Sequence, residues 1–262
     1  MILQSFRSEW IKLRRPTLLF GTFGGVALAA SFFTILTFTQ APATGAGSFD
    51  LPSLAGLAQP NGLIHGMSRA VVLLGVVAFG IAATQIAAEY SLGTLRQLLV
   101  RQPRRFTLLA GKYLAVISFL VAAVVIASVI TGGVALVLAH IRHVPVAAWF
   151  SSAGLADLTR ALGMLLLAVI GFATLGFAAG MFLKSSVFAV ILGFAYLLPF
   201  ESILERIVPS TGHWLPGSLI GVVGQGGTAT DGFARSLMIS TVYLAAIAAG
   251  TIVAFRRRDV TA

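Results

Sequence analysis

Six long stretches of the chain contain no charged residue, and they constrain its fold more than any other feature. They are residues 16–39, 70–88, 113–139, 161–183, 185–200 and 236–255. The hydrocarbon core of a bilayer is about 30 Å thick, and about 20 apolar residues in an α-helix cross it. The fifth stretch is short and has to continue past Glu201 to about residue 207. We therefore expect an all-α integral membrane protein with six transmembrane helices, in one domain that covers residues 1–262.

The composition excludes most soluble classes of protein. Of the 262 residues, 58% are hydrophobic and 10% are charged, and the mean hydropathy is +0.96. Soluble domains have about 25% charged residues, so this chain cannot cover a water-facing surface of ordinary polarity. The same hydropathy argues against disorder. The absence of cysteine excludes disulfides, thiolate nucleophiles and cysteine metal sites.

The charges are distributed unevenly between the two sides that six spans define. The chain has 18 Lys and Arg residues against eight Asp and Glu residues. With the N-terminus inside, the cytoplasmic segments hold the cations Arg7, Lys12, Arg14, Arg15, Arg96, Arg101, Arg104, Arg105, Lys112, Lys184, Arg256, Arg257 and Arg258. The other side holds as many acids as cations, so the excess follows the positive-inside rule. We expect both termini to be cytoplasmic, and no nucleic-acid partner is needed to explain the charge.

Residues 1–15 have the pattern of a short amphipathic helix. Ile2, Leu3, Phe6, Trp10 and Leu13 fall within one arc of the helix, and the cations lie elsewhere. Such a helix lies in the interface of the membrane, and Pro16 suits a bend into the first span. The alternative is a basic tail that only fixes the topology.

The segment between the second and third spans is the most informative part of the chain. Gly93 permits a sharp change of direction, and Thr94 can cap a helix that Pro103 ends. That helix sets Leu95, Leu98 and Leu99 on one face and Arg96 on another. A protein partner or the lipid interface has to cover these leucines. Glu89 is an acid at the inner end of a span, and its candidate partners are Arg96, Arg104 and Arg105.

Between the fifth and sixth spans, residues 218–223 form an apolar run that is too short to cross a bilayer. We expect a re-entrant or interfacial helix there, on the outer side. Glu201 and Glu205 share a helix face and could hold a cation or a proton, but an exposed helix end is the preferred interpretation. Trp149 and Phe150 are candidate interfacial anchors.

The residues that enzymatic chemistry requires do not occur in the right patterns. A phosphate-binding loop needs a glycine five positions before its Gly-Lys pair, and Phe106 occupies that position before Gly111 and Lys112. His140 and His143 have ligand-like spacing, but two imidazoles make an incomplete zinc site. We expect no catalytic, metal-binding or cofactor-binding residue in this chain.

Several of these motifs together resemble the type-two ABC exporter permeases, especially the small bacterial and actinobacterial members. The motifs are Ser8-Glu9-Trp10 with Lys12, Glu89-Tyr90 followed by Gly93-Thr94-Leu95-Arg96, Pro103-Arg104-Arg105 leading to Gly111-Lys112, and Phe255-Arg256-Arg257-Arg258-Asp259. The resemblance covers nearly the whole chain in the number and order of the spans. It departs from the tripartite-efflux members of the superfamily because no large extracellular domain is present.

The resemblance implies a permease domain with an N-terminal elbow helix, a cytoplasmic coupling helix and an outer re-entrant element. The elbow residues are Phe6, Glu9, Trp10 and Lys12, and the coupling residues are Glu89, Gly93, Thr94, Leu95, Arg96, Leu98, Leu99, Arg104 and Arg105. It implies export of a hydrophobic or amphiphilic substrate across a bacterial plasma membrane, with a second permease subunit and a separate ATPase that binds ATP and Mg²⁺. The alternatives are a stand-alone secondary transporter and an integral membrane enzyme. The former predicts paired repeats and buried acids, and the latter predicts acids or histidines that converge at one membrane depth.

Overall fold

The protein is a multi-pass helical membrane protein. The computed structural model describes residues 2–43, 51–93 and 105–257, and every regular element in these ranges is helical. Six helical segments are long and apolar enough to cross a membrane, as the sequence predicts. They are α2 (Pro16–Gln40), α5 (Val71–Ser91), α7 (Arg105–Ile141), α8 (Ser152–Leu183), the α9–η4–α10 segment (Ser186–Ile207) and α12 (Phe233–Arg257).

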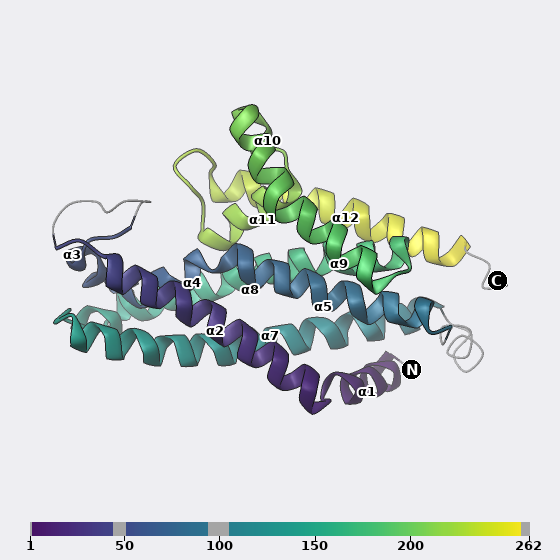
Figure 1. Ribbon diagram of the computed structural model, residues 1–262, viewed down its shortest axis with the longest axis horizontal. Coiled ribbons are helices and arrows are strands. Elements are labelled where there is room, and N and C mark those ends of the chain that lie inside the picture. Colours follow the sequence, from purple (N-terminus) through teal and green to yellow (C-terminus); the bar gives the residue numbers. More distant parts are fainter. Residues whose placement is uncertain (1, 44–50, 94–104, 258–262) are drawn as a thin grey trace.

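Shorter helices connect or flank these spans. They are α1 (Ile2–Leu13), α3 (Leu54–Leu57), η2 (Pro60–Ile64), α4 (His65–Arg69), η3 (Ala147–Phe150), η5 (Pro209–Thr211) and α11 (Pro216–Gln225). Figure 1 shows α1 and the C-terminal end of α12 at the same end of the elongated molecule, with α3 at the opposite end. The two ends of the chain therefore lie on the same side of the bundle.

Two of the spans are longer than their uncharged stretches. Helix α7 begins at Arg105 instead of residue 113, and α8 begins at Ser152 instead of residue 161. At the start of α8, the Ser151 side chain accepts a hydrogen bond from the Gly154 amide at 3.1 Å, which caps the helix. The 37 residues of α7 extend for about 55 Å, well beyond the hydrocarbon core. The extra turns place charged residues on helices that continue out of the bilayer.

The fifth span is interrupted between two short helices. Helix α9 (Ser186–Ala195) passes through a π-helical turn, η4 (Tyr196–Phe200), into α10 (Glu201–Ile207). Pro199 lies inside that turn, and proline has no amide hydrogen to donate to the helix ladder. The wide turn absorbs this defect, and α10 projects away from the bundle in Figure 1.

The core of the bundle is built on close contact between α5 and α8. A methyl group at Gly176 would lie 2.1 Å from the Phe79 carbonyl oxygen, and one at Gly180 would lie 2.3 Å from that of Ala83. Glycine at these positions lets the two backbones approach closely, which is how helices often pack in membranes. Phe172 and Met181 of α8 are among the fully buried side chains around this contact.

A second, smaller core lies at the end of the bundle away from α1. Trp149 is fully buried there, and its indole nitrogen donates a hydrogen bond to the Leu57 carbonyl at 2.9 Å. The expectation that Trp149 anchors the membrane interface is therefore wrong, because this hydrogen bond and the packing against Phe38 hold it inside the protein. Its neighbour Phe150 is exposed.

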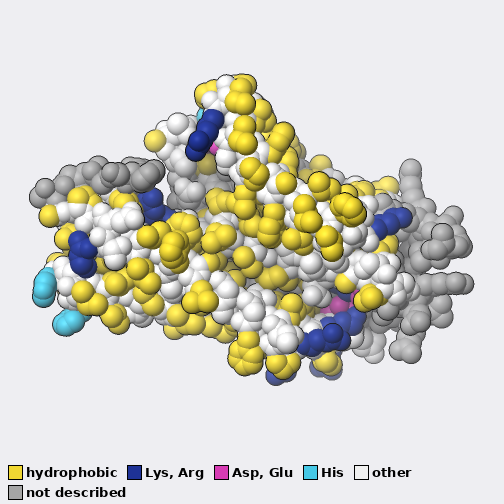
Figure 2. Space-filling view, viewed as in Figure 1, with side chains coloured by type: hydrophobic (Ala, Val, Ile, Leu, Met, Phe, Trp, Pro, Cys, Tyr) yellow, Lys and Arg dark blue, Asp and Glu magenta, His cyan; other side chains and the backbone are white. Residues whose placement is uncertain are grey.

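Many hydrophobic side chains are exposed between the two ends of the molecule. In Figure 2 they extend over the middle of the molecule, and Lys and Arg side chains gather towards its ends and edges. The α12 and α9–α10 spans are the least buried of the six. Such a surface is stable in lipid, where apolar side chains carry no cost of exposure to water.

Candidate functional site

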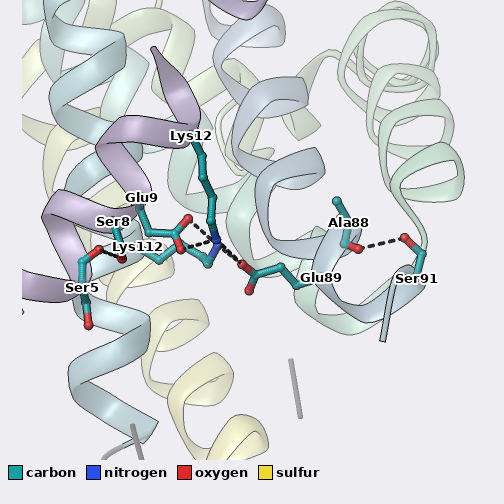
Figure 3. A network of polar contacts seen from close by, with 8 residues as sticks. All are labelled: Ser5, Ser8, Glu9, Lys12, Ala88, Glu89, Ser91 and Lys112. Carbon is teal, nitrogen blue, oxygen red and sulfur yellow. Dashed lines mark hydrogen bonds and ion pairs between the residues drawn. The ribbon is translucent and has the colours of Figure 1, made fainter. Parts of the chain in front are cut away.

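The most concentrated group of charges lies where α1, α5 and α7 meet. We call Glu9, Lys12, Glu89 and Lys112 the four-charge cluster. Glu9 and Lys12 belong to α1, Glu89 lies near the C-terminal end of α5, and Lys112 is two turns into α7 (Figure 3). Three elements that are distant in the sequence thus contribute to one polar site at the end of the bundle that holds α1.

Lys112 is the centre of the cluster. Its Nζ atom donates to Glu9 Oε2 at 2.8 Å and to Glu89 Oε1 at 2.6 Å. The side chain of Lys112 is 2% exposed, and those of Glu9 and Glu89 are 3% and 8% exposed. A charge buried this deeply is stable only when it is paired and hydrogen-bonded, so the three residues depend on one another.

Lys12 closes the cluster from the surface. Its Nζ atom donates to Glu9 Oε1 at 2.7 Å and to Glu89 Oε1 at 3.3 Å, while its side chain remains 41% exposed. Burial raises the pKa of Glu9, but the two ammonium groups lower it by more, so its pKa is below the ordinary value. For Lys12, burial lowers the pKa and the two carboxylates raise it by more. With two acids and two lysines, the formal charges of the cluster balance.

The elbow residues Phe6 and Trp10 pack against the protein and do not only face lipid. Their rings stack with centroids 5.7 Å apart, and Trp10 meets Phe119 of α7 edge-on at 6.3 Å. Leu3, although it belongs to the same arc, and Ile11 remain exposed. The α1 helix is therefore held to α7 by aromatic contacts and by the four-charge cluster.

The structure describes the beginning and the end of the predicted coupling segment. Gly93 has a φ of +66°, a left-handed conformation that glycine adopts without strain, so the backbone departs from helical geometry at the end of α5. Thr94, Leu95, Arg96, Leu98, Leu99 and Arg104 lie outside the described residues, and Arg105 begins α7. Glu89 pairs with Lys112 and Lys12, neither of which was among its expected partners.

Sequence reasoning missed the role of Lys112. It treated the Gly111–Lys112 pair as the boundary of the third span, although α7 starts two turns earlier. A signal was present, since Glu89 and Lys112 flank the same loop and carry opposite charges. Choosing Lys112 over the nearby arginines required the length of α7, which the uncharged stretch does not give.

A second polar site lies where α10 and α11 meet, and there the expectation of exposed acids is wrong. Glu201 is 2% exposed because its carboxylate accepts hydrogen bonds from the amides of Gly217 at 3.0 Å and Ser218 at 2.7 Å. These amides begin α11, which forms where the sequence predicts a short apolar helix. A carboxylate at a helix N-terminus satisfies amides that have no partner within the helix.

The fold and these two sites define a helical membrane protein with a buried ionic cluster at one end. Among the described residues, no group of three or more His, Asp or Glu side chains has the geometry of a metal site. The chain belongs to the family described as "Protein of unknown function (DUF2705)", whose family model matches residues 26–261. The match begins inside α2, at residue 26, and includes the five spans that follow it. A comparison with curated proteins found no match.

Proposed function

We propose that the protein is the membrane-spanning permease subunit of an ATP-driven ABC exporter. In this proposal it moves a hydrophobic or amphiphilic substrate out of a bacterial cell by alternating access. A separate ATPase subunit binds ATP and Mg²⁺ and supplies the energy, and a second permease subunit, identical or different, completes the channel. Both termini and the segment of residues 94–104 face the cytoplasm.

The four-charge cluster is the observation that supports this proposal best. Glu89 precedes the 94–104 segment and Lys112 follows it, and the two side chains meet at 2.6 Å. A force applied to the segment is therefore transmitted to both α5 and α7. Because Lys112 also binds Glu9, the same force reaches α1. A subunit driven by an external motor needs a connection of this kind between its docking segment and its spans.

One oxygen of the Glu89 carboxylate is not used in the four-charge cluster. Glu89 Oε2 is buried and has no hydrogen-bond partner among the described residues, whereas its Oε1 atom accepts two hydrogen bonds from lysines. An unpaired buried carboxylate oxygen costs free energy, so a donor that reaches it stabilises the arrangement. We propose that the docked and undocked states of the 94–104 segment differ in whether such a donor is present.

The proposal is tested by purifying the tagged protein from its host in a mild detergent and measuring bound ATPase. We expect an ATPase to co-purify. Leu95→Ala combined with Leu99→Ala should weaken its binding by tenfold or more, because each buried leucine contributes about 1.5–3 kcal/mol. The matched control is Leu183→Ala, at the end of α8, which should leave binding unchanged.

A second variant separates docking from coupling. Glu89→Gln keeps the shape of the side chain but weakens its bond to Lys112, so the ATPase should still bind while substrate-stimulated ATP hydrolysis in nanodiscs falls. If no ATPase co-purifies, or if the leucine variant binds it normally, the protein is not a subunit of this kind. Transport by the chain alone in ATP-free liposomes would instead favour a secondary transporter.

A further inference from the structure

A ligand-sized cavity lies between α10, α11 and the turn before α12, far along the chain from the four-charge cluster. Its volume is about 690 Å³, within the range of pockets that hold small organic molecules. Ser210, Gln225 and Thr230 line it and are exposed, so the cavity is open to the surroundings of the protein. A glycine of α11, Gly221, also lines it and leaves room beside Val72.

One part of the cavity wall is apolar. Val72 of α5, Phe172 of α8 and Leu197 of η4 form this part, and Phe172 and Leu197 are buried in the main core. These side chains come from three spans that contact one another. This part of the wall gives a hydrophobic group of a ligand an apolar surface to pack against.

The remaining wall carries acidic charge. Glu201, Glu205 and Asp231 line the cavity, and no Lys or Arg among the described residues does so. Asp231 is neutralised, because it binds Arg235 at 2.9 Å and His213 at 2.7 Å. Glu201 and Glu205 have no such cation, and the described ion pairs include neither of them.

The two glutamates share a single hydroxyl group. Ser218 Oγ lies 3.1 Å from Glu201 Oε2 and also makes a short contact with Glu205 Oε1. A serine hydroxyl has one proton and can donate it to one acceptor at a time. Among the described residues, Glu201 has further donors in the two α11 amides and the Tyr196 side chain, whereas Glu205 accepts a hydrogen bond from Ser218 alone. Glu205 is therefore the carboxylate that a positively charged ligand group would satisfy.

We propose that this cavity binds an amphiphilic organic cation. The apolar wall takes the hydrophobic body, and the Glu205 carboxylate, with Glu201 beside it, takes the positive charge. A charge-assisted contact of this kind is strong where water is partly excluded. The inference goes beyond the proposed function, because binding to this cavity needs neither ATP nor a partner subunit.

The first test measures binding of radiolabelled tetraphenylphosphonium to the purified protein in nanodiscs without nucleotide. We expect saturable binding, weakened about tenfold or more in Glu205→Gln. Asp157→Asn removes an acid that does not line the cavity and should bind like the unmodified protein. Tetraphenylborate has a similar shape and the opposite charge, and it should not compete. Equal binding in Glu205→Gln, or equal competition by tetraphenylborate, would overturn the proposal.

The second test locates the ligand without relying on affinity. The chain has no cysteine, so Thr230→Cys introduces a unique thiol at the cavity. A cationic methanethiosulfonate should modify it faster than an anionic one, and tetraphenylphosphonium should slow the reaction. Thr159→Cys on α8, which is exposed and outside the cavity, should show neither effect. Unprotected Thr230→Cys at saturating tetraphenylphosphonium would place the ligand elsewhere.

Discussion

Lys112 shows how much one residue can contribute to holding a membrane bundle together. It pairs with one acid from α1 and one from α5, and its side chain is almost completely buried. Pairs of this kind contribute little net stability compared with apolar residues, but removing one partner leaves an isolated buried charge. The stability of the protein should therefore fall when one residue of the cluster is replaced, and fall less when the paired residues are replaced together.

The first prediction follows from this asymmetry. Lys112→Met leaves two buried carboxylates without their main partner and should lower the free energy of unfolding by about 3–5 kcal/mol. Lys12→Met removes the same charge from a half-exposed position and should cost at most about 1 kcal/mol. Unfolding by sodium dodecyl sulfate, followed by circular dichroism, measures both. Adding Glu9→Gln and Glu89→Gln to Lys112→Met should recover much of the loss, and equal losses in the two lysine variants would contradict the prediction.

At the scale of residues, the sequence analysis named three of the four residues of the four-charge cluster as candidate site residues but not Lys112. Glu89 stands out because it is an acid at the inner end of a span, where a charge needs a reason to be present. Glu9 and Lys12 were named only through the resemblance to a permease elbow helix. The contact of Glu9 with Lys112 joins residues 103 positions apart, and no periodicity encodes it. The burial of Glu201 was missed for the same reason, because it depends on how α11 meets α10.

At the scale of elements, the contact between α5 and α8 depends on where glycines lie along α8. Gly176 faces the α5 backbone, whereas Gly163 on the same helix is exposed and has no atom within 4 Å of an added methyl group. Two glycines of one helix thus have opposite environments. Small residues at a membrane helix contact allow the close approach that stabilises it.

The second prediction compares these two glycines. Gly176→Ala forces the helices apart and should lower the free energy of unfolding by about 1–3 kcal/mol. Gly163→Ala should raise it slightly, by up to about 1 kcal/mol, because alanine favours the helix. The same detergent titration measures both. If Gly176→Ala is as stable as Gly163→Ala, the close α5–α8 contact does not contribute as described.

The ends of the helices were predicted well where a helix ends close to the first charged residue. They were predicted poorly where the helix continues past that residue. Helices α2 and α12 begin or end within a few residues of the uncharged stretches. Helix α8 extends nine residues further back, because Ser151 caps it and Asp157 and Arg160 can face water on a helix that leaves the bilayer. The π-helical turn at Pro199 was not foreseen, since a proline in an apolar run does not reveal how the helix accommodates it.

At the scale of the whole molecule, α1 and the end of α12 lie on the side to which the positive-inside rule assigns the excess of basic residues. Helix α1 and the end of α12 lie at the same end of the bundle, as six crossings require (Figure 1). The number and order of spans followed from hydropathy alone. The contacts between spans could not be predicted from hydropathy, because an apolar helix face can pack equally well against lipid or against another helix.

The third prediction assigns that shared end to the cytoplasm. A reporter fused after Asp259 should indicate a cytoplasmic location, and one inserted at residues 44–50 should indicate an external location. The reason is that basic segments are retained on the cytoplasmic side. Paired alkaline phosphatase and green fluorescent protein fusions give the two readings. A C-terminal fusion that reports the exterior would contradict the orientation and, with it, the proposed docking side of the 94–104 segment.

The pairing of Glu9 with Lys112 also has a consequence for the order in which the chain is assembled. The buried partner of Glu9 emerges 103 residues after it during translation, whereas Glu89 and Lys112 are only 23 residues apart. Insertion of the α5–α7 hairpin can neutralise Glu89 at once. Glu9 cannot leave water at low cost until that hairpin is in place. Helix α1 is made before α2, α5 and α7 but is fixed in position after them, so its docking reports that these three spans have been assembled.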